Sequence, residues 1–359
     1  MQQTLSKNEM ISLFHLLFLF SLILCFFLLI STPIVYTIRP TTENQIQQLD
    51  ETTLIYSIII PTFKEAENIP PLLDRIKNVL ETNDLQTITE LIFVDDHSED
   101  LTKEIVQEYQ VNSTFKVRLI DRIGKSGLSS AVVDGFKEAR GKYLLCMDAD
   151  LQHPPESIIL LFNSLQENNC DFSIATRYPS RETLVKFNEP EGNFVNKNWS
   201  IFRKIVSAVA HSLSKPLFWK TNSIMTDPMS GFFALEKSLF DKANKIGINC
   251  LGFKISLELF IKSGTENNCE IPFQFGIRTK GESKLSTSTI IKYVQHLFSL
   301  YQYQFPLLFS TMIQFILILL IALMITVYYL FPARKVIERQ IKRSNNKRRS
   351  LQQFSRAKL

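Results

Sequence analysis

Two long stretches without a charged side chain constrain this chain more than any other feature. Asp, Glu, Lys and Arg are all absent from Met10 to Ile38 and from Tyr293 to Ala333. Apolar segments of about 20 residues are typical of helices that cross a bilayer. The central block of about 265 residues, 41–305, is enough for one large domain with its own core. With 28 Phe and 45% apolar residues, the chain is neither disordered nor a plain soluble protein.

The first uncharged stretch predicts a membrane anchor over residues 11–36, after a short tail, 1–10. Its apolar part, Ile11–Leu29, spans ~30 Å as a helix at 1.5 Å per residue. A cleaved signal peptide is the alternative. Its apolar core is normally shorter and ends at small residues, which the following STPIVYT matches poorly. We therefore expect an anchor that is not cleaved.

The second uncharged stretch predicts a transmembrane helix over 306–331, with tyrosines at both ends as at two headgroup layers. The preceding segment, 286–304, has apolar residues at helical intervals. This pattern indicates either an amphipathic helix in the membrane interface or one packed against the domain.

The tail, 332–359, carries ten Lys and Arg residues and a single acidic residue, Glu338. The positive-inside rule places such a tail in the cytosol, and one span before it then places the central domain on the opposite side. A basic tail resting on anionic headgroups is compatible with either orientation.

The central block alternates between predicted strands and helices. Strands are expected at Ile55–Ile60, Leu91–Val94, Lys116–Ile120 and Tyr143–Met147, with Pro61 ending the first. Helices are expected at Glu67–Leu80, Ser98–Tyr109 with Ser98 as N-cap, and Ser129–Ala139. This alternation predicts an α/β domain with a mainly parallel sheet covered on both faces.

Polar residues follow three of these strands: Thr62 to Glu65, Asp95–Asp96, and Asp148 to Asp150. In parallel sheets the ligand crevice lies beyond the carboxyl ends of the strands. The sequence therefore places the site at this edge.

The segment Asp148-Ala149-Asp150-Leu151-Gln152 presents oxygen ligands at every second position. If it is extended, Asp148, Asp150 and Gln152 share one face. Two carboxylates and an amide oxygen suit a hard cation such as Mg²⁺ or Mn²⁺, with phosphates completing its shell. The alternative is ordinary use of Asp in turns and caps.

Glu65 and Asp96 can accept hydrogen bonds from a nucleobase or a ribose, or Asp96 can cap a helix. Basic residues form a second set. Arg177 follows a strand-like run, and Arg203 and Lys204 lie on an apparent helix with Ser207 one turn on.

Arg278 and Lys284 flank a turn in RTKGESK. Such a turn can bring both cations onto one phosphate cluster, whereas single exposed cations are usually solvated surface.

Five cysteines occur, at positions 25, 146, 170, 250 and 269, an odd number without metal-ligand spacing. We expect them to be reduced thiols facing a cytosolic redox environment.

The chain resembles glycosyltransferase family 2, with the GT-A nucleotide-diphospho-sugar transferase fold, a Rossmann-like α/β domain expected over 41–285. The resemblance extends over about 57–305. It is carried by SIIIPTFKEAENI, IFVDDHSED, GLSSAVVDGFKEARGKYLLCMDADLQHPPE, IATRY, TDPMSGFFAL, LGFKISLEL and FGIRTKGESKLS. The combination of DADLQHPPE, DPMSGFF and RTKGESKLS is highly specific, and the resemblance is close to the branch that transfers mannose to dolichyl phosphate.

This resemblance implies transfer of mannose from GDP-mannose to dolichyl phosphate, with inversion, giving dolichyl β-D-mannosyl phosphate. That product donates mannose in N-glycan, GPI-anchor and O-mannose assembly. The resemblance also implies Mg²⁺ or Mn²⁺ as cofactor, contact with the lipid bilayer, and an endoplasmic reticulum location with the catalytic domain facing the cytosol. Neither a nucleic acid nor an obligatory protein partner is expected.

The family's functional positions carry over by motif. The nucleotide-sugar set is Pro61, Phe63, Glu65, Val94 and Asp96 for guanosine, and Asp148, Ala149, Asp150, Gln152, Arg177, Arg278 and Lys284 for the diphosphate side. Within it, Asp148, Asp150 and Gln152 are the metal ligands, and Asp148, Asp150, Arg278 and Lys284 the catalytic set. Arg203 and Ser207 would bind the acceptor phosphate. Asp227 would lie near the sugar or brace the site.

Phe63 stands where the family often has Tyr, so it can stack on a base but lacks the hydroxyl group. A dolichyl-phosphate glucosyltransferase using UDP-glucose, often with an N-terminal span, is the nearest alternative. A non-catalytic membrane scaffold of the same fold is another. Asn112 and Asn198 fit the N-glycosylation pattern, which requires a lumenal domain if either is used.

Overall fold

The computed structural model describes residues 54–167, 170–190, 194, 201–218, 225–252, 254–276 and 287–356. All of them belong to a compact unit of residues 52–359, and the predicted N-terminal anchor at 11–36 lies outside the described residues.

A seven-stranded sheet of order β3-β2-β1-β4-β6-β5-β7 forms the centre of the domain. Its strands are β1 (Tyr56–Thr62), β2 (Thr89–Asp95), β3 (Lys116–Asp121), β4 (Tyr143–Cys146), β5 (Phe172–Thr176), β6 (Phe233–Glu236) and β7 (Asn268–Pro272). Only β6 runs antiparallel to its neighbours, β4 and β5. The predicted α/β class with a mainly parallel sheet is confirmed.

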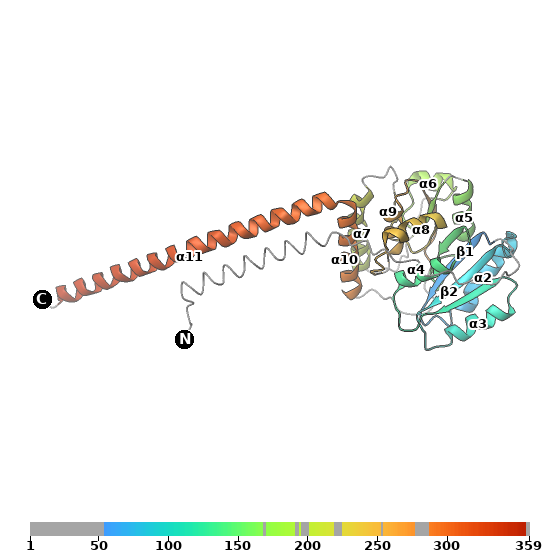
Figure 1. Ribbon diagram of the computed structural model, residues 1–359, viewed down its shortest axis with the longest axis horizontal. Coiled ribbons are helices and arrows are strands. Elements are labelled where there is room, and N and C mark those ends of the chain that lie inside the picture. The colour runs from blue at the N-terminus through green and yellow to red at the C-terminus, as the bar shows by residue number, and fades with distance from the viewer. Residues whose placement is uncertain are drawn as a thin grey trace. The chain divides into compact units, whose positions relative to one another are not determined.

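Helices cover both faces of the sheet (Figure 1). One face packs against α2 (Ile69–Thr82), α3 (Thr102–Asn112) and α5 (Ser157–Glu167). The other packs against α4 (Leu128–Glu138), α8 (Lys237–Ile246), α9 (Ile255–Ser263) and α10 (Thr287–Gln304). Because β1 and β2 are buried on both sides, their residues form continuous apolar runs instead of alternating.

Two predicted boundaries were wrong for local reasons. Pro61 does not end β1, because it pairs with Val94 and the strand continues to Thr62. Ser98 does not cap α3, which begins four residues later at Thr102. The Ser98 N–H and hydroxyl instead donate to the carboxylate of Asp95, at 2.6 and 2.8 Å.

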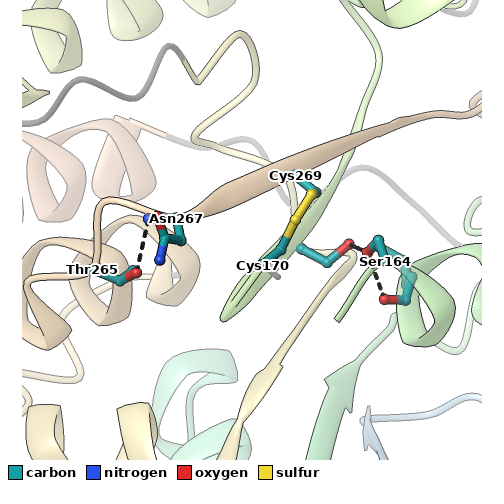
Figure 2. The surroundings of a disulfide bond; sticks show 7 residues. Ser164, Cys170, Thr265, Asn267 and Cys269 are labelled. Atoms are coloured by element: carbon teal, nitrogen blue, oxygen red, sulfur yellow. Dashed lines mark hydrogen bonds between the residues drawn. A yellow bond between two sulfur atoms is a disulfide. The ribbon is translucent and has the colours of Figure 1, made fainter. Parts of the chain in front are cut away.

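Cys170 and Cys269 form a disulfide between the start of β5 and the edge strand β7, with Cα atoms 5.8 Å apart (Figure 2). The expectation of reduced thiols is therefore wrong for this pair. The disulfide depends on the tertiary structure, because β5 and β7 pair in parallel although 99 residues separate the two cysteines. Among the described cysteines, Cys146 and Cys250 are free thiols.

Helices α7 (Ile201–Ser214) and α10 lie side by side at one end of the domain (Figure 1). The hydroxyl of Tyr293 donates to the carbonyl of Ala210 at 2.9 Å, and that of Tyr301 to the carbonyl of Leu213 at 2.7 Å. The short elements α6 (Arg181–Lys186) and η1 (Lys215–Phe218) complete the domain.

Helix α11 (Pro306–Arg356) follows α10 directly. Its stretch Pro306–Thr326 has a mean hydropathy of 2.6 and is not buried against the rest of the protein. This stretch is long and apolar enough to cross a membrane. The helix does not end with the predicted span, because it continues through the basic tail to Arg356.

Candidate active site

Strands β2, β1 and β4 are neighbours and run in the same direction, so their carboxyl ends meet at one edge of the sheet. The loops after these strands contain the acidic residues that the sequence singled out. The expected location of the site thus agrees with the topology.

Asp95 organises the loop after β1. Its fully buried carboxylate accepts hydrogen bonds from Thr62 Oγ1 at 2.9 Å and from Ser98. The backbone N–H groups of Lys64 and Glu65 donate to Ser98 Oγ and Thr102 Oγ1, at 2.8 and 2.9 Å. These contacts fix the loop, and Phe63, at the end of β1, is 42% exposed.

Arg122 is a buried cation that sequence reasoning missed. Its guanidinium donates to Asp96 at 2.5 Å and to Asp134 at 3.1 Å. The other oxygen of Asp96 accepts the backbone N–H of Gly127 at 2.7 Å. Asp96 therefore shapes the loop that leads into α4, with a small exposed fraction of its side chain left toward solvent.

Pro61, Val94 and Ala149 were assigned to the nucleotide-sugar set, and all three are buried. Val94 has no exposed surface and packs in the core beneath α4. Its side chain cannot touch a bound nucleotide in this conformation, so its part is to shape the end of β2.

The segment after β4 is bent, because Leu151 adopts a left-handed conformation with φ of 63°. The extended geometry from which convergence of Asp148, Asp150 and Gln152 was inferred is therefore wrong. Asp150 accepts the backbone N–H of Gln152 at 3.1 Å, which closes a tight turn. The side chain of Asp148 is 36% exposed, whereas Asp150 and Gln152 are buried.

Gly276 holds this turn from the other side. Its N–H donates to the carbonyl of Gln152 at 2.9 Å, and its own carbonyl accepts from Gln152 Nε2 at 3.2 Å. A Cβ at position 276 would lie 2.7 Å from the carbonyl oxygen of Leu151, so only glycine allows the approach. The chain after β7 is thereby joined to the Asp148–Gln152 turn.

His153 packs beneath the turn. Its Nδ1 accepts the backbone N–H of Asp148 at 2.9 Å, and its ring stacks on Phe232 with centroids 5.0 Å apart. Burial lowers the pKa of His153, although Asp148 and Asp150 act in the opposite direction. A neutral imidazole is the form that accepts a hydrogen bond at Nδ1.

Gly231 lies next to Asp148. A Cβ built at Gly231 would lie 3.7 Å from both carboxylate oxygens of Asp148. The loop 227–231, which contains Gly231, therefore faces the Asp148 carboxylate without a side chain between them.

Arg177 and Asp227 form a buried bidentate pair. Arg177 Nε and Nη2 donate to the two oxygens of Asp227, at 2.7 and 2.9 Å, and the Arg177 N–H adds a third bond. The two side chains are 11% and 2% exposed. Burial lowers the pKa of Arg177, but the attraction of Asp227 outweighs it, so the pKa is raised.

Both suggested roles of Asp227 were left open by the sequence, and the structure shows the bracing contact. Arg177 also lies over the ring of Phe275, 5.3 Å from its centroid.

Lys254, at the start of α9, is a further cation missed in the sequence, and its Nζ donates to the carbonyl of Met229 at 2.8 Å. The motif LGFKISLEL contained it, but a lone Lys carries no local signal.

Glu270 on β7 lies behind the Asp227 loop. It accepts hydrogen bonds from the backbone N–H and from the hydroxyl of Thr226, the latter at 2.8 and 2.9 Å. Burial raises the pKa of Glu270 to about 7, against the hydrogen bonds from Thr226, which lower it.

Ser207 on α7 lies 3.4 Å from the hydroxyl of Tyr178, the residue after Arg177. This acceptor-phosphate candidate is thus close to the Arg177 segment. The side chain of Arg203, and the whole of Arg278 and Lys284, lie outside the described residues. Within the described part of the chain, no three His, Cys, Asp or Glu residues gather into a metal-binding group.

An α/β domain with carboxylates and buried cations at the carboxyl edge of its sheet is typical of enzymes that bind phosphorylated ligands. The chain belongs to glycosyl transferase family 2, whose model matches residues 57–238.

Three curated relatives bear the name dolichol-phosphate mannosyltransferase. The Saccharomyces cerevisiae protein is 42% identical over 255 residues, 70% of this chain and 88% of the relative. The Mycosarcoma maydis protein is 40% identical over 276 residues, 76% of this chain and 86% of the relative. The Pyrococcus furiosus protein is 41% identical over 248 residues, 69% of this chain and 64% of the relative.

Among solved structures, mannosyl-3-phosphoglycerate synthase from Rubrobacter xylanophilus matches with a TM-score of 0.46 at 19% identity. It covers 70% of this chain and 75% of that one. This distant likeness carries no argument about ligands.

We expect Asp227→Asn to destabilise the protein by roughly 2–4 kcal/mol, because it leaves the buried Arg177 charge without its counter-ion. Thermal unfolding in detergent measures the change. Glu156→Gln is the matched control, since it removes one carboxylate of the exposed bidentate pair with Arg75 and should cost below about 1 kcal/mol. Equal losses in the two variants would contradict the bracing role.

Glu270 predicts a pH dependence of stability. Its pKa is higher in the folded protein, about 7, than the ordinary 4.5, so its contribution is complete below about pH 4.5 and is lost as the pH rises through about 7. In the wild type, the free energy of unfolding should therefore fall by on the order of 1–3 kcal/mol over this range because of Glu270. We expect Glu270→Gln to abolish this fall. Unfolding temperatures between these pH values test this, with the exposed Glu266→Gln as control. Parallel profiles for wild type and Glu270→Gln would exclude it.

Proposed function

We propose that this protein transfers mannose from GDP-mannose to dolichyl phosphate with inversion, giving dolichyl β-D-mannosyl phosphate. The observation that carries the proposal is the identity of 40–42% to three relatives named dolichol-phosphate mannosyltransferase. The geometry at the carboxyl edge of β2, β1 and β4 is compatible with a nucleotide-sugar donor there.

The guanosine half of the donor would lie over the end of β1. The exposed ring of Phe63 can stack on a base, and Glu65 and Asp96 supply acceptor oxygens for guanine or ribose. Because Asp95 and Ser98 already hold the loop in place, little backbone ordering is needed when the base binds.

A divalent cation fits the next part of the site. Asp148 and Asp150 offer carboxylate oxygens, and the side chain of Asp148 is 36% exposed. We propose Mg²⁺ or Mn²⁺, held by Asp148 and Asp150 with Gln152 nearby. When bound, the ion would offset the negative charge on the departing GDP.

The basic residues would position the anions of both substrates. Arg177 lies over the ring of Phe275, and Lys254 Nζ donates to the carbonyl of Met229, in the loop that also contains Gly231. Arg278 follows Gly276 by two residues, and Gly276 is bonded to Gln152. We therefore assign Arg278 and Lys284 to the diphosphate and the acceptor phosphate, with Arg203 and Ser207 on the acceptor side.

The acceptor needs no strong general base. A phosphate monoester has a second pKa near ~6, so at neutral pH its oxygen is already a nucleophile. Direct displacement at the anomeric carbon by this oxygen inverts the configuration. The protein's contribution is to hold two mutually repelling anions in line by electrostatic positioning.

The acceptor lipid would reach the site along α7 and α10. The outward residues of α10, Ile291, Val294 and Phe298, are each more than half exposed. Tyr293, Leu297 and Leu300 on the same helix are buried against the domain. One face of α10 therefore packs against the domain, and the other is an exposed apolar face suited to a membrane interface. The exposed face leads into the apolar part of α11.

We also propose that the domain faces the cytosol at the endoplasmic reticulum membrane, because its donor is a nucleotide sugar. On that side of the membrane Asn112 would not be glycosylated. The Cys170–Cys269 disulfide and the basic tail favour the opposite side.

The function is tested with purified protein in phosphatidylcholine vesicles that contain dolichyl phosphate. We expect transfer from GDP-mannose, at least about ten-fold faster than from UDP-glucose, as differential binding of one donor allows. Asp150→Ala should lower the rate by on the order of 10²–10³ with the fold retained. The exposed Asp74→Ala, on α2, is the control and should keep full activity.

Faster transfer from UDP-glucose would establish the glucosyltransferase instead. Absence of transfer from either donor, together with failure to bind GDP and Mn²⁺, would identify a non-catalytic scaffold. Arg278→Ala and Lys284→Ala test the phosphate-binding assignment, and full activity in either variant would refute it for that residue.

Orientation is tested in sealed microsomes. We expect Asn112, exposed at the end of α3, to carry no glycan, so that wild type and Asn112→Gln migrate equally with and without glycosidase. Added protease should digest the domain while the membrane is intact. A glycan at Asn112 would place the domain in the lumen and remove the cytosolic assignment.

A further inference from the structure

Helix α9 contains a buried charge cluster that the proposed chemistry does not use. All nine residues of α9 are buried, among them Glu258 and Lys262. Glu258 Oε1 accepts from Lys262 Nζ at 2.6 Å and from the backbone N–H of Asn249 at 2.7 Å. Glu258 Oε2 is 3.0 Å from Nε2 of His296, which is equally buried.

These contacts join α9 to α10, the helix that precedes the apolar span. His296 lies on α10, and so does Tyr303, whose ring centroid is 5.8 Å from Lys262 Nζ. Ser299 between them accepts a hydrogen bond from Asn249 Nδ2 at 3.0 Å. Residues 296, 299 and 303 recur at helical spacing, so one face of α10 is held by α9 and the loop before it.

The other end of α9 holds the loop beside Asp148. Lys254 donates to the carbonyl of Met229, and Ser256 Oγ to those of Pro228 and Ser230, at 3.2 and 2.8 Å. This loop contains Asp227, the partner of Arg177. A single buried helix therefore contacts the active-site loop at one end and the membrane-proximal helix at the other.

Packing alone does not require charges here. An apolar cluster of similar volume is often as stable as a buried ion pair, or more so, because burying charges costs desolvation energy. Directional bonds from one carboxylate to α9, to the loop before it and to α10 instead define one relative position of these elements. Burial raises the pKa of Glu258, but its hydrogen bond with His296 and the charge of Lys262 outweigh this, so the pKa is lowered and the carboxylate stays ionised.

We infer that Glu258 is a positioning residue, which through Lys262 and His296 fixes α10, and with it the membrane span, relative to the loop 227–231. The inference rests on the proposed function in one respect: a lipid acceptor must enter from the membrane at a set height relative to the donor. An acceptor dissolved in water does not need this alignment.

The experiment compares wild type, Glu258→Gln and Glu90→Gln. Glu90 is a matched control, because it is a buried carboxylate bonded to Arg118 at 3.0 Å and to Ser57 at 2.7 Å, on β2 and without a contact to α10. Mannose transfer is measured to dolichyl phosphate in vesicles and to a short, water-soluble isoprenyl phosphate.

For Glu258→Gln we expect the KM for dolichyl phosphate to rise about ten-fold, with the KM for GDP-mannose and for the soluble acceptor within about two-fold of wild type. Glu90→Gln should leave the ratio between the two acceptors unchanged. The inference would be overturned if Glu258→Gln lost activity equally with both acceptors. It would also be overturned if Glu258→Gln and Glu90→Gln changed the ratio between the two acceptors in the same way.

Hydrogen exchange of the α10 backbone gives a readout that does not depend on activity. We expect faster exchange in 290–304 for Glu258→Gln and not for Glu90→Gln. If Glu258→Gln does not fold, Glu258→Gln with Lys262→Met removes the unpaired cation and should still release His296. Unchanged exchange in α10 would refute the positioning role. Absence of transfer by wild type to both acceptors would refute the proposed function alone.

Discussion

The buried pair of Arg177 and Asp227 is the interaction on which the active-site edge depends. It joins the end of β5 to the loop 227–231, and that loop faces the carboxylate of Asp148. A site for a nucleoside diphosphate needs both cations and carboxylates within a few ångströms, and unpaired charges of either kind are costly to bury. Pairing the two inside the protein lets the sheet edge keep its shape before any ligand binds, which is the condition for electrostatic preorganisation.

The same principle recurs at the other loops. Asp95 holds the loop after β1, and Arg122 with Asp96 holds the loop before α4. Glu270 holds Thr226 from the edge strand β7, to which the disulfide with Cys170 adds a covalent link. Each loop of the candidate site is thus fixed by a buried polar group of its own, whereas Phe63 and the side chain of Asp148 are partly exposed at the same edge.

The alternation of the first four strands with helices α2, α3 and α4 was predictable because apolar runs are local, although Ser98 does not cap α3. The edge carrying the site was predictable because parallel strands bring their carboxyl ends together. Three features were not. The antiparallel β6 and the Cys170–Cys269 pair depend on which distant strands meet. The bend at Leu151 depends on the backbone approach of Gly276, more than a hundred residues later. Arg122 and Lys254 resemble any surface cation in the sequence and acquire their roles only through burial and partners.

The proposed membrane attachment imposes a further geometric demand on a site of this kind. A domain attached to a membrane through α11 can tilt, and tilting changes the distance between the site and the lipid headgroups. Two sets of contacts oppose this. The tyrosines of α10 bond to α7, and the Glu258 cluster bonds α10 to α9. Because α9 also supports the loop of Asp227, the bonds that resist tilting are continuous with those that shape the site. The charged core of α9 is therefore explained by the need for one fixed alignment between membrane and active site, which apolar packing specifies less sharply.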